Sequence, residues 1–299
     1  MLKQRVEEIK STLGRFDFPK EVIVEVSSCC NLKCVMCPQQ QLTRERKFMS
    51  NDIFFKIVDE IKKESETKRI WPAIMGEPLL DPEIIKKMSY AGSSELDIHF
   101  NTNALLMNEK VAENLIISGV KSFYIGLDAV NMSTYKKVRV GGSYHDAVKN
   151  TIKLLEMAKG SDVKVYAQFI DMDENEGERD DFIEFWKGMG AIVKIRPRLG
   201  WGLGVDTDRL VLQDSQRDFP CPWLNRTISI HADGNIVQCD ADWDDKNVIG
   251  NVNNKSIKEI WDELGEKRER HWKGDFNFGN CDKCKDWQAG KSYFYYPED

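Results

Sequence analysis

Three cysteines within eight residues constrain this chain more than any other feature of its sequence. Cys30, Cys34 and Cys37 follow the spacing Cys-x3-Cys-x2-Cys, and thiolates this close together can hold three corners of one iron–sulfur cluster. A structural zinc site would need a fourth ligand nearby, whereas the next cysteine is Cys221. The apolar run at 22–26 predicts a strand just before the motif. We therefore expect the cysteines on the loop at the carboxyl end of that strand, where α/β enzymes carry their reactive groups.

The composition indicates a globular chain and disfavours several classes of protein. Its 299 residues suffice for one large or two modest domains, and 41% are hydrophobic and 31% charged. The start at 1–5 is too polar for a secretory signal and no apolar run approaches the length of a membrane span, so we expect a cytoplasmic protein without a membrane partner. The net charge of −6 disfavours a nucleic-acid partner. Eight cysteines without an export signal indicate metal or redox chemistry rather than disulfides.

Apolar, strand-like runs alternate with helical segments between residues 21 and 198. Strands are predicted at 21–27, 69–75, 97–103, 122–128, 164–170 and 192–198. Helices are predicted at 50–65, 81–94, 108–119, 143–160 and 177–190, after a charged lead-in helix within 1–20. Pro72 lies inside the second strand and predicts a bulge or an early end there. The alternation predicts an α/β fold with a parallel sheet and right-handed crossovers, and six such units are too few for a full eight-stranded barrel.

Each predicted strand has one apolar and one polar face. Phe123, Ile125 and Leu127 illustrate the apolar face, which should pack against the helices. The polar face contributes Asn101, Asn103, Asp128, Tyr166, Gln168, Arg196 and Arg198. A closed barrel usually fills its interior with branched aliphatic side chains. A polar interior therefore predicts a bound polar molecule or, alternatively, a network of side chains that satisfy one another.

A second set of cysteines follows a glycine-rich segment at 200–204. The set consists of Cys221, Cys239, Cys281 and Cys284. An Asp-Gly turn predicts a β-hairpin over 227–238, which would bring the first two of these cysteines together. A capping box at 256–259 predicts a helix that runs to about residue 270. By their spacing alone, four thiolates with one Cys-x2-Cys pair fit a zinc ribbon as well as an iron–sulfur cluster.

The first cysteine motif resembles the cluster motif of the radical S-adenosylmethionine (SAM) enzymes, although that family usually has an aromatic residue where this chain has Met36. The resemblance implies a partial (β/α)6 TIM-like barrel over 21–200 and a [4Fe–4S] cluster on Cys30, Cys34 and Cys37, whose open iron chelates SAM. It also implies that one electron from an external donor of the flavodoxin or ferredoxin kind splits SAM. The resulting 5′-deoxyadenosyl radical then abstracts a hydrogen atom from the substrate.

The C-terminal segment, 201–299, resembles the shortened SPASM, or Twitch, extension of the same family. This resemblance implies a small domain of a β-hairpin and a helix, with one auxiliary [4Fe–4S] cluster on Cys221, Cys239, Cys281 and Cys284. Four thiolates leave no iron open for substrate, so the expected role of this cluster is to accept or relay an electron. The cysteine spacing is similar to that of radical SAM dehydrogenases with this architecture.

Gly76 and Glu77 end the second predicted strand in the sequence Met-Gly-Glu-Pro. The position resembles the Gly-Gly-Glu motif of the family, whose backbone meets the amino group of SAM. A glycine lets the backbone approach a ligand, and the Glu77 carboxylate can accept a hydrogen bond from an ammonium group. Without the cysteines, the same residues would indicate an ordinary turn before a helix.

Other strand ends carry residues that the resemblance assigns to the cofactor. Asp128 matches the family position near the SAM ribose, with Gly126 where a serine is common. Asn101 and Asn103 resemble the end of the third family strand. Asn175 resembles the first residue of an Asn-x-x-Glu motif near the adenine, although the segment fits a helix cap equally well.

These features favour a radical SAM oxidoreductase for a small polar substrate of the sugar or cyclitol kind. We expect a two-electron oxidation in which the auxiliary cluster accepts the second electron. Arg196 and Arg198 are candidates to bind the substrate or stabilise an anionic intermediate, with Tyr166 and Gln168 as further contacts. The alternatives are epimerisation or cross-linking of a ribosomally made peptide, and a non-catalytic zinc-binding module. Cys29 belongs to neither set and is expected to be a buried packing residue.

Overall fold

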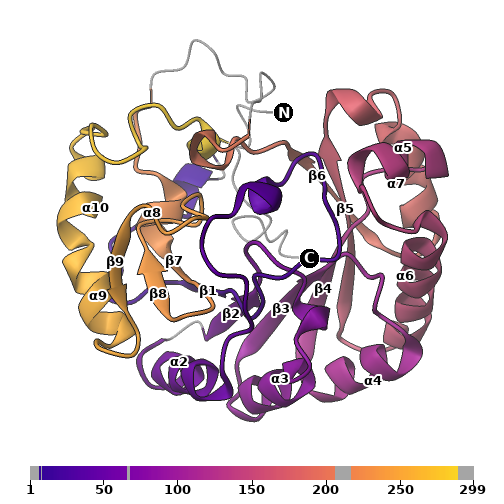
Figure 1. The fold of residues 1–299 in the computed structure, drawn as a ribbon, viewed down its shortest axis with the longest axis horizontal. Helices are drawn as coiled ribbons and strands as arrows, with labels where there is room; N and C mark the ends of the chain where they lie inside the picture. Colours follow the sequence, from indigo (N-terminus) through magenta and orange to yellow (C-terminus); the bar gives the residue numbers. More distant parts are fainter. Residues whose placement is uncertain (1–6, 8, 66–67, 206–216, 289–299) are drawn as a thin grey trace.

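The computed structural model of this chain describes residues 7, 9–65, 68–205 and 217–288. Its strands form one nine-stranded sheet in the order β6-β5-β4-β3-β2-β1-β7-β8-β9. The strands are β1 (Glu21–Val24), β2 (Arg69–Pro72), β3 (Asp97–Thr102), β4 (Val120–Gly126), β5 (Lys164–Asp171), β6 (Ile192–Pro197), β7 (Thr227–Ile230), β8 (Asn235–Val237) and β9 (Val248–Asn251). In this order, every neighbouring pair from β6 to β7 is parallel, and the sheet curves into a partial barrel (Figure 1). The six predicted strands are confirmed, and the second ends early, at Pro72.

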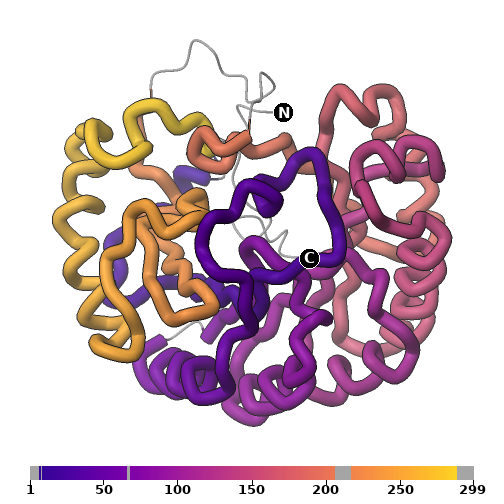
Figure 2. Tube along the Cα trace, in the orientation of Figure 1, coloured from indigo at the N-terminus to yellow at the C-terminus, as the bar shows by residue number. Residues whose placement is uncertain are grey.

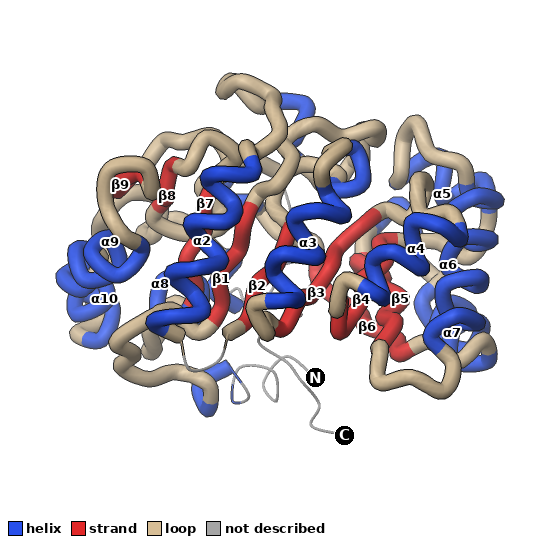
Figure 3. Tube along the Cα trace, turned by 90° about the horizontal axis from the view of Figure 1, so that it is seen from below, coloured by secondary structure: helices blue, strands red, loops and turns tan. Residues whose placement is uncertain are grey.

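Helices cover the outside of the parallel strands (Figures 1 and 3). The helices are α2 (Asn51–Glu64), α3 (Ile84–Ser93), α4 (Glu109–Ile117), α5 (Met132–Val138), α6 (Tyr144–Ala158), α7 (Arg179–Gly188), α8 (Pro222–Arg226), α9 (Ile257–Glu263) and α10 (Gly265–Trp272). The five predicted barrel helices are confirmed as α2, α3, α4, α6 and α7. Ser50 and Asn108 cap α2 and α4 by accepting a hydrogen bond from Ile53 N and Val111 N. α5 is an additional helix that the apolar pattern does not predict.

The two faces of the strands separate as predicted. Phe123 and the other residues of the apolar faces lie in the main core, between the sheet and the outer helices. The inner faces carry aromatic rings near mid-strand. Trp71 stacks on His99 and Tyr124 stacks on Tyr166, each pair with ring centroids 4.4 Å apart. These rings fill the interior beneath the polar side chains, so a ligand site is left at the carboxyl ends of the strands.

The C-terminal part of the chain continues the same sheet. β7 pairs in parallel with β1, with Thr227 opposite Glu21. β7 and β8 form the predicted antiparallel hairpin, and Gly234 in its turn has a φ of 89°, which glycine adopts without strain. The prediction of one helix to about residue 270 is wrong in one respect, because α9 and α10 are separate helices that meet at Leu264. Domain boundaries at residues 20 and 200 stay predictions.

The predicted lead-in helix falls partly on residues 1–6 and 8, which lie outside the described residues. Residues 9–11 are helical, and Ile9 is buried against Phe219 and Trp287 of the C-terminal part. Within the described ranges, no helix combines the length and the apolar character that crossing a bilayer requires.

Candidate active site and second cysteine site

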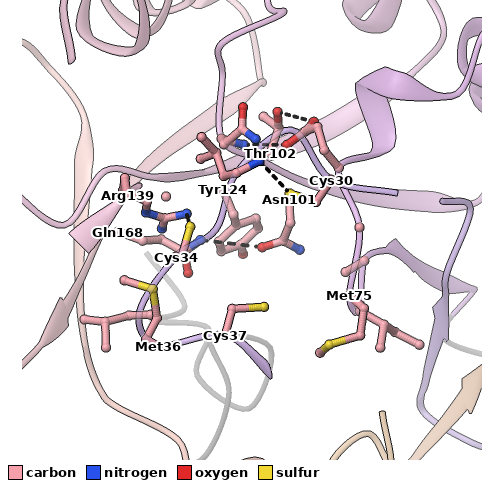
Figure 4. Close-up of a pocket in the computed structure, with 18 of the residues that line it drawn as sticks. Cys30, Cys34, Met36, Cys37, Met75, Asn101, Thr102, Tyr124, Arg139 and Gln168 are labelled. Carbon is pink, nitrogen blue, oxygen red and sulfur yellow. Dashed lines mark hydrogen bonds between the residues drawn. The ribbon is translucent and has the colours of Figure 1, made fainter. Parts of the chain in front are cut away.

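The loop after β1 carries the first three cysteines across the opening of the barrel (Figure 2). Cys30, Cys34 and Cys37 line one pocket there, together with Met36 and Met75 (Figure 4). In the described part of the chain, no group of three or more His, Cys, Asp or Glu side chains converges as the ligands of a single metal ion do. Three thiols that line one pocket can each bind a different iron atom of one cluster.

Burial keeps the free thiols of this loop protonated. It raises the pKa of Cys30 to about 11 and the pKa of Cys37 to about 12. Burial also raises the pKa of Cys34, against the opposing effect of Arg139, whose Nη1 lies 3.7 Å from the Cys34 Sγ. Metal ligands are thiolates, so loading a cluster must release protons from this pocket.

Gly76 and Glu77 join the end of β2 to the cysteine loop, and both line the pocket. A Cβ at Gly76 would lie 1.9 Å from the carbonyl oxygen of Ser27, so a side chain does not fit here. The Glu77 N–H donates to the carbonyl of Cys29 at 2.8 Å. The glycine is therefore required by the backbone of the cysteine loop itself. The side chain of Cys29 is half-buried, in contrast to the buried role that the sequence predicts.

The Glu77 carboxylate is buried and accepts three hydrogen bonds from the protein. The donors are Thr102 Oγ1 at 2.7 Å, Asn103 N at 2.8 Å and Leu79 N at 3.1 Å. Burial raises the pKa of Glu77, and these donors oppose the shift. Glu77 thus ties the end of β3 to the segment after β2 beside the cysteines, a role that the strand-end motif does not reveal.

The predicted cofactor residues lie in two layers. Asn101 and Asn103 line the pocket at the end of β3, and Asn103 Nδ2 donates to Asn31 Oδ1 of the cysteine loop at 2.8 Å. Asp128 and Asn175 lie behind this wall, since neither is among the described residues that line the pocket. Asn175 Nδ2 donates to the backbone carbonyl of Asp128 at 2.9 Å, so it fixes the segment that carries Asp128.

Arg139 is a pocket residue that the sequence motifs do not indicate. It follows α5, and its Nε lies 2.7 Å from the carboxylate of Asp128, which is fully buried. Burial is the largest single effect and lowers the pKa of Arg139, but Asp128, together with Cys34 and Tyr135, raises this pKa overall. A Cβ at Gly126 would come within 2.1 Å of Arg139 Nη2. The glycine at a position where the family commonly has serine is therefore the sequence signal that makes room for this guanidinium.

Two of the four predicted substrate contacts line the pocket. They are Gln168 and Arg196, and Arg196 Nη1 donates to Gln168 Oε1 at 2.9 Å. Tyr166 is 3% exposed and belongs to the stacked rings beneath them. Arg198 donates to the carbonyl oxygen of Val35 at 3.0 Å, so it holds the cysteine loop from a place outside the described pocket wall.

The second set of cysteines lines a separate pocket in the C-terminal part of the chain. These cysteines are Cys221, Cys239, Cys281 and Cys284. The first precedes α8 and the second follows β8, so the hairpin helps to bring them together as predicted. Gln238 Nε2 donates to the Cys281 Sγ at 3.2 Å, and burial raises the pKa of Cys281 to about 12. The four side chains thus form a half-buried thiol set without help from the first loop.

Comparison with known families identifies both parts of the chain. Residues 24–185 match the radical SAM superfamily, and this match covers more than half of the chain. The chain belongs to the radical SAM superfamily. Residues 221–286 match SPASM, an iron–sulfur cluster-binding domain, so it is a member with such a domain after the barrel.

Known relatives match more than half of the chain. A probable GTP 3′,8-cyclase of Methanococcus maripaludis is 30% identical over 174 residues, which are 58% of this chain and 57% of the relative. The mycofactocin maturase MftC of Mycobacterium ulcerans is 28% identical over 192 residues, which are 64% of this chain and 50% of the relative. The chain thus spans about half the length of the curated relatives that it matches.

Solved structures share the fold of nearly the whole chain. The crystal structure of BtrN in complex with AdoMet and 2-DOIA aligns with a TM-score of 0.67 and 18% identity, over 94% of this chain and 99% of BtrN. The Streptococcus suis protein SuiB, bound to its precursor peptide SuiA, aligns with a TM-score of 0.72 and 14% identity, over 96% of this chain and 74% of SuiB. At these identities the similarity is one of fold.

The family defines the cofactors. A radical SAM domain binds a [4Fe–4S] cluster and SAM, and a SPASM domain carries additional iron–sulfur centres. The zinc interpretation that the cysteine spacing left open is therefore set aside. The donor sets fit, because three thiols surround the pocket with the polar wall and four surround the second pocket. Which cysteine binds which cluster stays a prediction.

Proposed function

We propose that this chain is a radical SAM dehydrogenase that oxidises a small, polar, sugar- or cyclitol-like metabolite. The observation that carries the proposal is the composition of the pocket. Polar side chains at the ends of β3, β5 and β6 share the pocket with the three cysteines, where a barrel usually has aliphatic ones. These side chains are Asn101, Asn103, Gln168 and Arg196. Such groups recognise hydroxyl and amino substituents through directed hydrogen bonds.

The bound cofactors would supply the 5′-deoxyadenosyl radical that takes a carbon-bound hydrogen, and an acceptor for the second electron. The substrate would then lose its hydroxyl proton to a base and one electron to the auxiliary cluster, so that a C–OH carbon becomes a C=O carbon. Arg196, held by Gln168, would stabilise the negative charge that develops on oxygen as the proton leaves. A guanidinium is suited to this role because it stays cationic throughout.

The same proposal gives roles to the residues around the cofactor. The first three cysteines would hold the cluster that binds SAM, and the other four the auxiliary cluster. Gly76, Asn101 and Asn103 share the pocket with the first set and can contact SAM directly. Asp128 and Asn175 would act from behind the wall, by fixing the segment and the guanidinium beside them.

The test uses anaerobically reconstituted protein with 2-DOIA, the compound in the BtrN complex, and related amino-cyclitols. Wild-type protein should give a product that has lost two hydrogens, together with one 5′-deoxyadenosine per product. A Cys281→Ala/Cys284→Ala variant should still cleave SAM but accumulate no oxidised product, because the second electron then lacks its acceptor. A product of unchanged mass, or SAM regenerated in each turnover, would overturn the dehydrogenase assignment.

Peptide modification is a second candidate. Two observations favour it: the fold is similar to that of SuiB bound to a precursor peptide, and 64% of the chain is similar in sequence to the maturase MftC. Incubation with short peptides encoded beside this gene would test it by mass spectrometry in deuterated buffer. A peptide that gains deuterium without other mass change indicates epimerisation, and a peptide that loses two hydrogens indicates cross-linking. An unchanged peptide beside an oxidised cyclitol rejects this candidate.

We also propose that the reducing electron comes from an acidic flavodoxin- or ferredoxin-like protein that docks beside the cysteine loop. Lys33, Lys136 and Lys137 are exposed there, and none of them forms a salt bridge within the described part of the chain. The backbone hydrogen bond from Lys33 N to Val140 O, at 2.9 Å, places the cysteine loop alongside the end of α5. Because the whole chain is acidic, with a net charge of −6, this local positive patch would orient an acidic partner.

A further inference from the structure

A turn at 200–204 separates the two cysteine pockets and touches both. Trp201 lines the first pocket, and Gly202 lines the second. The short helix η4 (Trp201–Leu203) has positive φ at each residue, with 48° at Trp201, 59° at Gly202 and 84° at Leu203. Residues with side chains rarely adopt this conformation. It persists only when the surrounding structure holds it in place.

The carboxylate of Asp286 holds this turn from the side of the second site. Asp286 is 3% exposed, and its two oxygens accept separate backbone hydrogen bonds, from Gly200 N at 2.7 Å and from Gly202 N at 2.8 Å. Asp286 begins η5 (Asp286–Gln288), two residues after Cys284. The position of the turn is therefore set by the segment that carries the last cysteine of the second set.

The same turn also contacts the cysteine loop of the first site. The Trp201 indole N–H donates to the carbonyl of Met36 at 3.0 Å, between Cys34 and Cys37. The Trp201 carbonyl accepts from the indole N–H of Trp243 at 3.2 Å, and both indoles pack in one apolar cluster with Cys37. Hydrogen bonds on the two sides of this turn thus link Asp286, just after Cys284, to Met36, just before Cys37.

We propose that Asp286 is a positioning residue that couples the four-cysteine site to the SAM pocket through the 200–204 turn. When the second site is loaded, the segment after Cys284 is fixed and Asp286 keeps Trp201 against the first cysteine loop. When the second site loses a ligand, Asp286 no longer constrains the turn and Trp201 moves off that loop. SAM then binds less tightly, although the first three cysteines are intact. The proposal rests on the family's cofactors and not on the dehydrogenase reaction.

The direct test is Asp286→Asn. Asparagine keeps the size of the side chain but offers one acceptor oxygen, so one of the two backbone N–H groups faces an NH2 group instead. The variant should bind SAM about tenfold more weakly, as expected when a buried hydrogen bond to a charged group is lost. Its iron content should equal that of wild type. Asp282→Asn is the matched control, because Asp282 is an exposed residue of the same cysteine segment, and its SAM affinity should be unchanged.

Two further variants locate the effect. Cys284→Ser, which opens the second site, should weaken SAM binding to the same extent, and the double variant with Asp286→Asn should be no weaker, because both act through one turn. Trp201→Phe removes the indole donor, together with part of the ring that lines the first pocket, and should reproduce the loss. It should also make the protein insensitive to Cys284→Ser. If Asp286→Asn loses iron, its SAM affinity cannot be interpreted, and Trp201→Phe then provides the test.

SAM affinity is measured by equilibrium dialysis without substrate, alongside iron counting and the electron paramagnetic resonance spectrum of the reduced first cluster with and without SAM. A wrong substrate or reaction type therefore leaves these results unaffected. Wild-type SAM affinity in a fully loaded Asp286→Asn or Trp201→Phe protein would overturn the proposal. So would losses from Cys284→Ser and Asp286→Asn that add in the double variant.

Discussion

The two cysteine sites of this chain differ in where their ligands come from and in how many they offer. The first three cysteines lie on one loop after β1, within eight residues. The second four extend from Cys221 to Cys284: the β7–β8 hairpin lies between the first two, and the segment after α10 brings the other two to the same pocket. If each set holds one [4Fe–4S] cluster, as we propose, the first set would leave one corner open beside a polar pocket, whereas the second would saturate its cluster. Under that assignment, bond-making chemistry would belong to the incomplete, locally encoded site.

Removal of each site in turn gives the largest expected effect and tests this contrast directly. A Cys30→Ala/Cys34→Ala/Cys37→Ala variant should lose about four of about eight irons per chain and all SAM cleavage. A Cys281→Ala/Cys284→Ala variant should lose about the same iron but retain SAM cleavage at saturating SAM, because the open corner remains. Iron counting and chromatography of 5′-deoxyadenosine measure both. Cleavage of SAM by the triple variant would break the comparison.

The wall of the first site depends on a buried ion pair, and breaking it should cost stability. Arg139→Gln leaves the fully buried carboxylate of Asp128 without its cation. We expect the free energy of unfolding of the metal-free, reduced protein to fall by about 3–5 kcal/mol in urea titrations. Addition of Asp128→Asn should recover most of the loss. Arg179→Gln is the control, because Arg179 and Asp180 form an exposed pair 3.3 Å apart and its loss should cost less than about 1 kcal/mol.

Much of the barrel is predictable because its signals are local. The alternation around Phe123 and the helix predicted over 108–119 each depend on neighbouring residues, and both are confirmed. The pairing of β7 with β1 joins strands 206 positions apart, as between Glu21 and Thr227, and no local pattern encodes it. The break at Leu264 is missed for a related reason, since the capping box specifies where a helix starts but not where it bends.

The candidate site divides in the same way. The cysteine motif predicts the residues that share the first pocket, and strand-end polarity predicts Asn101, Gln168 and Arg196 on its wall. Tyr166 belongs to the same polar face by sequence, yet it packs behind Tyr124, which lines the pocket, and is not itself among the described residues of the wall. The periodicity of a strand fixes the face on which a side chain lies but not its depth along the barrel. A residue such as Arg139, brought in by an unpredicted helix, has no periodic signal at all.

A smaller effect is expected on the rate at which the electron donor reduces the first site. Lys136→Glu/Lys137→Glu reverses two charges next to the first cysteine loop and none near the second site. At low salt we expect about tenfold slower reduction by flavodoxin in stopped-flow measurements, with the difference shrinking as salt rises. Reduction by dithionite should stay unchanged. Lys62→Glu/Lys63→Glu, the same charge change in the last turn of α2, is the control. An equal effect of both variants would show that net charge, not docking, sets the rate.

The smallest effect concerns the buried aromatic layer beneath the first site, which includes Trp71 and a neutral histidine, His99. Burial, reinforced by the positive charges of Arg69 and Lys194, lowers the pKa of His99 from 6.5 to about 3. The unfolded chain therefore takes up a proton as pH falls through 6.5, while the folded protein does not. The free energy of unfolding is therefore higher above pH 6.5 and falls below it, by about 1 kcal/mol between about pH 7 and about pH 5.5.

His99→Asn should remove this part of the acid sensitivity. Asparagine can keep the hydrogen bond that the His99 Nδ1 shares with the Ser122 Oγ at 2.6 Å, but it does not titrate. Loss of the stacking on Trp71 lowers stability at every pH, so the measurement is the change in unfolding free energy between the two pH values. His145→Asn, at an exposed position, controls for the removal of a histidine as such. An unchanged pH dependence in His99→Asn would mean that the buried aromatic layer accepts a proton, and that the first site is not isolated from water as its buried rings imply.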